Sequence, residues 1–290
     1  MTHRDNGTVL LFVTAALLAG CAGLEDPEEG ELLGEAEGEL LGVNGLNPNA
    51  LSPSVLTLPV RSPIALSLPA LSSNPLDPSS LASSALTALR DLAWTGDVSR
   101  GLLRYTVECA LTASQSFSYT WTNLLGTVRN ETYWGLLGLA PAWSTQPLSA
   151  QGQEWVSACL ASRINWYGAS VTISARSPNP TQLRTTSAEQ SEYPMLEGAF
   201  WGDVFASPPR AFACYHAPNV AHSRSLLRDC ATGHPAPITG VPQDCGVVHV
   251  VGSCADHCSS SPASQGVLYT SCAADPGGAW TSRVITIYLP

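Results

Sequence analysis

The side chains that could perform catalysis are few and widely spaced. Glu197 and Asp203 flank the segment Gly-Ala-Phe-Trp-Gly, and two carboxyl groups so placed could serve as the acid and the base of a glycosidase. His216 is a further candidate base, within a group of histidines at positions 216, 222, 234, 249 and 257. The simpler interpretation is a capped turn whose Phe200 and Trp201 enter the core. The sequence has no Gly-x-Ser-x-Gly motif of a serine hydrolase, so its catalytic residues, if it has any, stay unknown.

A short apolar segment precedes the first cysteine. Thr8 to Gly20 is apolar but shorter than the roughly 20 residues that a membrane-spanning helix needs. The next feature, Leu18-Ala19-Gly20-Cys21, resembles the lipobox of bacterial lipoprotein precursors. The resemblance implies that residues 1–20 are a cleaved signal peptide and that Cys21 carries the acyl chains. Because Ala22 and not an aspartate follows, it also implies transfer to the outer membrane. A plain secreted protein is the alternative.

The other eight cysteines are an even number, which in an exported chain indicates four disulfides. We expect the pairs Cys109–Cys159 and Cys214–Cys230, with the remaining four paired among themselves. The alternative is a metal site at Cys254-Ala-Asp-His-Cys258, but its spacing is not that of the usual zinc pair, and an oxidising compartment disfavours free thiolates. We therefore expect no metal and no cofactor. The disulfide candidates are Cys109, Cys159, Cys214, Cys230, Cys245, Cys254, Cys258 and Cys272.

The negative charge of the chain is concentrated near its N-terminus. The formal net charge is −10, and Glu25 to Glu39 holds eight acidic residues and no basic one. From Leu86 onward, 13 acidic and 11 basic residues leave a balance of −2. A nearly neutral folded part lacks the basic surface of a nucleic-acid binder, so we expect no nucleic-acid partner.

Residues 21–78 form a segment rich in Leu, Pro, Ser, Gly and Glu with a five-residue period. That period matches neither a helix nor a strand. One alternative resembles the four-sided β-solenoid of pentapeptide-repeat proteins, but the many prolines would remove its ladder donors. We therefore expect a disordered spacer between the anchor and a folded domain. Leucine occupies positions 41, 46, 51, 56, 66, 71, 76, 81 and 86, and Arg61 is the single interruption.

Residues 79–290 are predicted to fold as one disulfide-stabilised α+β domain, with helices mainly in its first half and antiparallel strands mainly in its second. Helices are expected from Ser79 to about Gly96, from Asp97 to about Cys109, and from Gln153 to Trp166. The last of these should bury Trp155, Val156, Cys159, Leu160 and Ile164. Strands are expected at 117–121, 128–134, 171–175, 211–215, 247–251, 266–271 and 282–289, and a short helix or turn at 200–205.

Aromatic residues occur in pairs, which offers a second kind of functional surface. Flat rings exposed on a tethered domain would suit stacking on a sugar or on peptidoglycan, whereas large rings are more often part of a core. The sequence does not decide between these interpretations for any one pair. The pairs are Tyr119 with Trp121, Tyr133 with Trp134, Trp166 with Tyr167, and Phe200 with Trp201.

Several segments together resemble a family of myxobacterial lipoproteins, over nearly the whole mature chain. The resemblance implies a shared architecture and a surface or periplasmic location, and it carries over no catalytic residues. The segments are the Asn-Ala-Leu-type repeat, Leu103-Arg-Tyr-Thr-Val-Glu-Cys-Ala-Leu, Trp155-Val-Ser-Ala-Cys-Leu-Ala-Ser-Arg-Ile-Asn-Trp-Tyr, Glu197-Gly-Ala-Phe-Trp-Gly and Cys245-Gly-Val-Val-His.

These observations predict a cell-envelope lipoprotein held in the outer membrane, facing the periplasm or the cell surface. Its folded domain is expected to have a binding or structural role, with a polysaccharide or a protein as ligand. The alternative is a tethered hydrolase that acts on envelope or extracellular polymer. An enzyme should gather carboxylates or a histidine in a concave pocket, whereas a binding module should expose aromatic rings on a flatter face.

Overall fold

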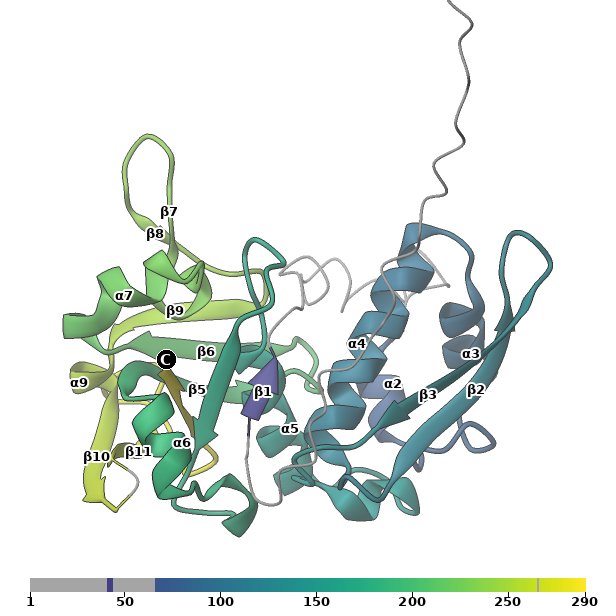
Figure 1. Ribbon diagram of the computed structural model, residues 1–290, viewed down its shortest axis with the longest axis horizontal. Coiled ribbons are helices and arrows are strands. Elements are labelled where there is room, and N and C mark those ends of the chain that lie inside the picture. Colours follow the sequence, from purple (N-terminus) through teal and green to yellow (C-terminus); the bar gives the residue numbers. More distant parts are fainter. Residues whose placement is uncertain (1–40, 44–65, 265) are drawn as a thin grey trace, which may run out of the picture. The chain divides into compact units, whose positions relative to one another are not determined.

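The computed structural model describes residues 41–43, 66–264 and 266–290 (Figure 1). The predicted signal peptide, Cys21 and most of the repeat lie outside these residues. The described part is one compact unit of helices and strands with four disulfides. Its main helices precede most of its strands along the chain, as predicted for an α+β domain. They are α2 (Leu68–Ser72), α3 (Ser83–Arg90), α4 (Trp94–Ala110) and α5 (Ala150–Ser162), and of the strands of the main sheet only β1 (Leu41–Val43) precedes them.

Part of the predicted spacer, residues 21–78, belongs to the fold: Leu41–Val43 form strand β1 of the main sheet, and the continuous described segment starts at residue 66, thirteen residues before the predicted boundary at residue 79. Four leucines of the five-residue repeat, Leu66, Leu71, Leu76 and Leu81, are buried in the hydrophobic core. The Leu76 N–H donates to the Trp143 carbonyl at 2.7 Å, and the Trp143 indole donates to the Asn74 carbonyl at 3.0 Å. From residue 66 on, the repeat is therefore core and not spacer, because its leucines meet a partner surface that the period alone does not reveal.

The hairpin of strands β2 (Ser116–Thr122) and β3 (Val128–Trp134) packs on helices α3 and α4 in the first part of the described chain. The two strands pair as an antiparallel hairpin, with Phe117 opposite Tyr133. Alternation places Phe117, Tyr119 and Tyr133 on the buried face, which packs on α3 and α4. The hydroxyl oxygens of Tyr119 and Tyr133 lie 3.1 Å apart in a hydrogen bond, and burial raises the pKa of Tyr133 to about 12.

Helix α5 is the central element of the domain. It packs on α4 and also on strands β5 (Met195–Asp203), β6 (Arg210–Tyr215) and β12 (Ile285–Leu289) of the main sheet. Trp155, Val156, Cys159 and Leu160 are buried as predicted, and Ser157 on the helix accepts a hydrogen bond from the Val204 N–H at 2.8 Å. Since α5 is covered on opposite sides, it carries small or apolar residues nearly all round.

The main sheet has six strands in the order β1-β4-β12-β5-β6-β9. All neighbours pair antiparallel except β6 and β9, which are parallel. A second cluster of buried side chains, including Tyr193, Tyr269 and Tyr288, covers parts of β5 and β12 together with the hairpin β10–β11. The strands are β1 (Leu41–Val43), β4 (Thr172–Arg176), β5 (Met195–Asp203), β6 (Arg210–Tyr215), β9 (Val248–Ser253) and β12 (Ile285–Leu289).

Strand β5 corrects the prediction of a helix or turn at residues 200–205, because residues 200–203 belong to the strand and only residues 204–205 form a turn. The segment Gly-Ala-Phe-Trp-Gly lies in the middle of the sheet, with Phe200 and Trp201 both buried. Because both faces of β5 are covered, its sequence lacks the polar alternation that marks a surface strand. Gly198 is needed because a Cβ there would collide with the Cys214 carbonyl on β6.

The remaining elements are short. They surround the sheet and carry most of the polar side chains discussed below. They are α6 (Ser187–Glu192), α7 (Val220–Ser225), α8 (Asp229–Thr232), α9 (Cys254–His257), β7 (His234–Pro235), β8 (Pro242–Gln243), β10 (Cys258–Ala263), β11 (Gly266–Cys272), and 3-10 helices at Pro141–Ser144, Thr181–Leu183 and Ala217–Asn219.

The disulfides confirm one expected pair and correct another. Cys109–Cys159 joins α4 to α5 as predicted. The predicted pair Cys214–Cys230 is wrong, because strand β6 places Cys214 beside Cys254, while Cys230 on α8 meets Cys245. Cys258–Cys272 links β10 to β11. Cys230 is the nearer cysteine to Cys214 in the sequence. The parallel pairing of β6 with β9 instead places Cys254, which follows β9, next to Cys214.

Candidate functional site

Glu197, the first catalytic candidate, belongs to a buried ion pair. Its two carboxylate oxygens accept hydrogen bonds from Nε and Nη2 of Arg228 at 2.9 and 2.7 Å. Both side chains are fully buried. The Arg228 Nη1 also donates to the Ile164 carbonyl at 3.5 Å. A carboxylate clamped in this way has no access to a substrate, so its role is structural.

The other two candidates do not complete a site with Glu197. Asp203 lies six residues further along β5, which puts it roughly 20 Å away at about 3.3 Å per residue, too far for a glycosidase pair. Its carboxylate caps a turn by accepting the Phe205 N–H at 2.9 Å. His216 contacts the Tyr269 hydroxyl through Nδ1 at 3.5 Å, on the β11 side of the sheet, away from Arg228 on the α5 side.

His216 should therefore act on stability and not on catalysis. Burial lowers the pKa of its imidazole below the ordinary value of about 6.5. A lowered pKa means that the unfolded chain binds the proton more tightly, so stability falls as the pH drops below about 6.5. We expect His216→Gln to weaken this fall, as measured by urea unfolding between about pH 7 and pH 5. An unchanged pH profile would contradict this, and His222→Gln is the matched control.

A repeated motif that the sequence analysis missed organises a different cluster. Asp229-Cys230-Ala-Thr-Gly-His234 and Asp244-Cys245-Gly-Val-Val-His249 share the pattern Asp-Cys-x-x-x-His. The Cys230–Cys245 disulfide joins the two copies. In each copy the aspartate Oδ2 lies 2.8 Å from the histidine Nδ1. A comparison of the residues that flank Cys230 and Cys245 in the sequence would have revealed this motif.

The first copy has the better ordered surroundings. The rings of His234 and Trp166 stack in parallel with centroids 4.0 Å apart, and the Tyr167 ring meets His234 edge-on at 5.7 Å. The Tyr167 hydroxyl donates to Asp229 Oδ2 at 2.8 Å, and this hydrogen bond raises the pKa of Tyr167. The Asp229 side chain is 4% exposed and that of His234 is 18% exposed. Among the described residues, no protein group bonds His234 Nε2. We call Trp166, Tyr167, Asp229 and His234 the aromatic cluster.

The loop that carries the two rings is fixed by its own hydrogen bonds. Asn165 follows the end of α5, accepts the Tyr167 N–H at 2.8 Å and donates to the Leu227 carbonyl at 2.9 Å. The cluster is therefore rigid on the side of Trp166 and Tyr167, while the disulfide fixes the side of Asp229. Preorganised rings of this kind reduce the entropy lost when a ligand binds.

Only some of the predicted aromatic pairs offer a ring to the solvent. Tyr167 is 49% exposed and Trp134 is 54% exposed, whereas Phe200, Trp201 and Tyr119 are buried. Trp134 ends strand β3 without a polar cluster of the kind that surrounds Tyr167. The Trp166–Tyr167 pair is thus the one that combines an exposed ring with oriented polar groups.

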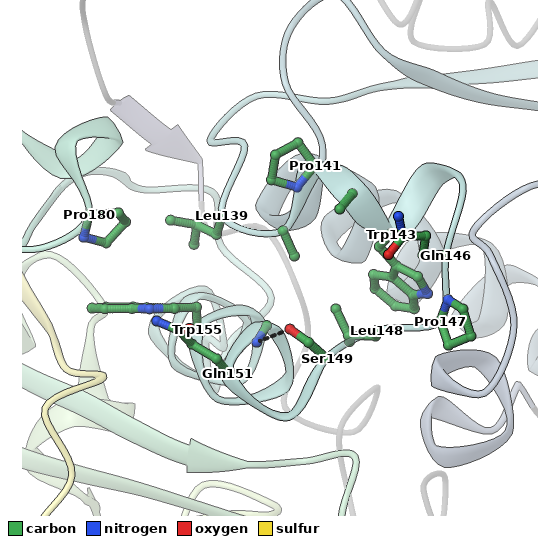
Figure 2. Close-up of a pocket in the computed structure, with 13 residues that line it drawn as sticks. Leu139, Pro141, Trp143, Gln146, Pro147, Leu148, Ser149, Gln151, Trp155 and Pro180 are labelled. Carbon is green, nitrogen blue, oxygen red and sulfur yellow. Dashed lines mark hydrogen bonds between the residues drawn. The ribbon is translucent and has the colours of Figure 1, made fainter.

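A groove lies next to the start of α5. Figure 2 shows Trp155 lying below Leu139 and beside Pro180, with the Ser149 hydroxyl capping the helix by accepting the Gly152 N–H at 3.1 Å. The groove measures about 280 Å³ and continues into a second hollow of about 430 Å³ lined by Asn179 and Arg283, among others. Neither hollow is lined by a carboxylate or a histidine, so neither offers groups for acid–base catalysis.

The cysteine sulfurs form the remaining cluster. The Sγ atoms of Cys214, Cys258 and Cys272 lie within 4.8 Å of one another, and Cys214 approaches Cys258 at 3.5 Å. All three belong to disulfides. They therefore have no S–H group to donate in a hydrogen bond and no thiolate to bind a metal. Two disulfides packed against each other explain this geometry.

A scan against protein-family models, a search of curated proteins and a search of solved structures each found no match to this chain. Function must therefore be argued from the residues themselves. None of the helices in the described part of the chain is long and apolar enough to cross a membrane.

Proposed function

We propose that this protein is a cell-envelope lipoprotein whose disulfide-stabilised domain binds a polysaccharide at the aromatic cluster. In this proposal the acyl chains on Cys21 hold the protein in the outer membrane. The observation that carries the binding role is the half-exposed Tyr167 ring, oriented by Asp229 and standing beside the stacked pair of Trp166 and His234.

The chemistry of the cluster fits a sugar ring. The apolar face of a sugar packs on a flat aromatic ring, while its hydroxyl groups need donors and acceptors at the edge of that ring. The His234 Nε2 supplies an acceptor, and Arg224 places a positive charge close enough to act on the Tyr167 hydroxyl. In this proposal the segment between the anchor and β1 is a spacer that lets the domain reach a polymer away from the lipid surface.

The test uses the chain from residue 21 with Cys21→Ser, called here the unacylated chain, folded under oxidising conditions. Residues 66–78 must be kept because they belong to the core. We expect retention on isolated cell-wall and polysaccharide material, and Tyr167→Ala should weaken it about tenfold through the lost ring contact. Trp280→Ala is the matched control, since Trp280 is also 49% exposed. Equal loss in both variants would refute the assignment of the site.

A hydrolase is the second candidate, and the Asp229–His234 pair is the observation that favours it. A carboxylate bonded to Nδ1 fixes the imidazole with Nε2 available as a general base. An enzyme would release soluble fragments from the same polymer, and His234→Asn would stop that release. The alternative would be excluded if the protein is retained on the polymer but releases no soluble fragments, and if His234→Asn changes only the affinity for the polymer.

A further inference from the structure

Exposed apolar side chains gather at one end of the helical part of the domain, on two neighbouring turns. Leu124 and Leu125, at the tip of the β2–β3 hairpin, are 80% and 88% exposed, and Val128 is 62% exposed. Leu92, between α3 and α4, and Trp94, the first residue of α4, are 42% and 64% exposed. We call these five residues the apolar end. Scattered single apolar residues are normal on a surface, but a group of this size indicates an interaction site.

The two turns are held next to each other by polar contacts. The Arg90 Nε donates to the Thr120 carbonyl at 3.1 Å, and the Arg100 guanidinium lies 4.0 Å above the Trp121 ring. These contacts join the end of α3 and the start of α4 to the hairpin just before its tip. The turn that carries Leu92 and the first turn of α4, which carries Trp94, therefore lie beside the strand that leads to Leu124 and Leu125.

The leucines have no role in forming the hairpin turn itself. The Asn123 side chain accepts the N–H groups of Leu125 and Thr127 at 3.0 and 2.9 Å, and Gly126 supplies the positive φ of 76°. Polar residues satisfy such a turn equally well, and they are the common choice at turns. Two adjacent leucines that project from a fixed turn therefore serve contact with something outside the chain.

We propose that the apolar end inserts into the surface of a lipid bilayer. This rests on the proposed lipid anchor, which would hold the domain within reach of a membrane. The side chains project from convex turns, a shape suited to entry between lipid headgroups, and a tryptophan next to leucines is typical of the membrane interface.

Charge plays a smaller part than apolar burial in this proposal. Arg90 and Arg129 are exposed at the apolar end, but Asp97 is exposed there as well and forms an ion pair with Arg100. Since the charges nearly balance, we expect that raising the salt concentration to about 0.5 M changes vesicle binding by less than about twofold. Insertion would complement the acyl chains by fixing the orientation of the domain on the membrane.

The experiment measures partitioning of the unacylated chain onto vesicles of phosphatidylethanolamine and phosphatidylglycerol by co-sedimentation. We expect binding by the otherwise unchanged chain and a loss of at least about tenfold in the variant Leu124→Asn/Leu125→Asn, because two fully exposed side chains lose their apolar contact. The matched control is Ile238→Asn, on the β7–β8 turn and 97% exposed, which should change binding less than about twofold. Acyl-chain quenchers in the bilayer should quench Trp94 fluorescence, and Trp94→Phe should remove that component.

Three results would overturn the proposal. They are failure of the unacylated chain to bind vesicles, equal binding by the double variant, and a self-associated chain in solution that the double variant converts to monomer. The last would assign the apolar end to a second copy of this chain. Polysaccharide retention through Tyr167 is measured separately on the same variants, so failure at the membrane is distinguishable from failure of the proposed function.

Discussion

Replacing Glu197 by glutamine should lower the free energy of unfolding by about 3–5 kcal/mol. The physical reason is that Arg228 would keep its charge in a fully buried position while losing the carboxylate that compensates it. Urea unfolding followed by circular dichroism measures the effect. Polysaccharide retention by the folded fraction should persist, because the pair does not belong to the aromatic cluster.

The matched control for this prediction is another ion pair on the same chain. Glu154 and Arg283 approach to 3.4 Å but are 39% and 36% exposed, so Glu154→Gln should cost less than about 1 kcal/mol. Should Glu197→Gln fail to fold, the double variant Glu197→Met/Arg228→Met removes both charges and should recover much of the loss. If Glu197→Gln were as mild as Glu154→Gln, the pair would not be the buried structural unit described here.

Leu71→Ala should lower the free energy of unfolding by about 2–5 kcal/mol, the usual cost of a cavity left by a buried leucine. Leu71 is 1% exposed and lies at an in-phase position of the five-residue repeat. This prediction separates two views of the repeat, because a leucine in a disordered spacer could be removed without any effect on stability. Thermal or urea unfolding of the unacylated chain gives the answer.

Leu125→Ala is the control for this second prediction. Leu125 is 88% exposed, so its truncation should change the stability by no more than about 0.5 kcal/mol. A Leu71→Ala variant that unfolds at the same urea concentration as Leu125→Ala would contradict the placement of residues 66–78 in the core. It would then support the start of the folded region at residue 79.

Local patterns predicted much of the fold correctly. The α5 stripe around Trp155 and Cys159 follows helical spacing, and the β2–β3 hairpin follows strand alternation, so both could be predicted from neighbouring residues. The helix at residues 150–162 also brings Cys159 to Cys109, which made that disulfide predictable. These features depend on contacts within one element or between adjacent ones.

The errors concern features that depend on distant contacts. Strand β5 is covered on both faces, so its Phe-Trp pair and its glycines resembled a turn. Cys214 finds Cys254 only through the β6–β9 pairing. The pair Trp166–Tyr167 was among the predicted aromatic pairs, but its contact with His234 was missed for a similar reason, since Trp166 and His234 are 68 residues apart and meet only after α5 and α8 pack near β6. The paired Asp-Cys-x-x-x-His motif was the local signal for it.

The most direct test of the proposed binding site is hydroxyl-radical labelling of the unacylated chain with and without a retained polysaccharide. Tyr167, Trp280 and Trp134 have similar exposed fractions of 49%, 49% and 54%, so they should be labelled to comparable extents in the free protein. We predict that the polysaccharide protects Tyr167 and leaves the two tryptophans unchanged. Protection of Trp134 or Trp280 without Tyr167 would contradict the assignment of binding to the aromatic cluster.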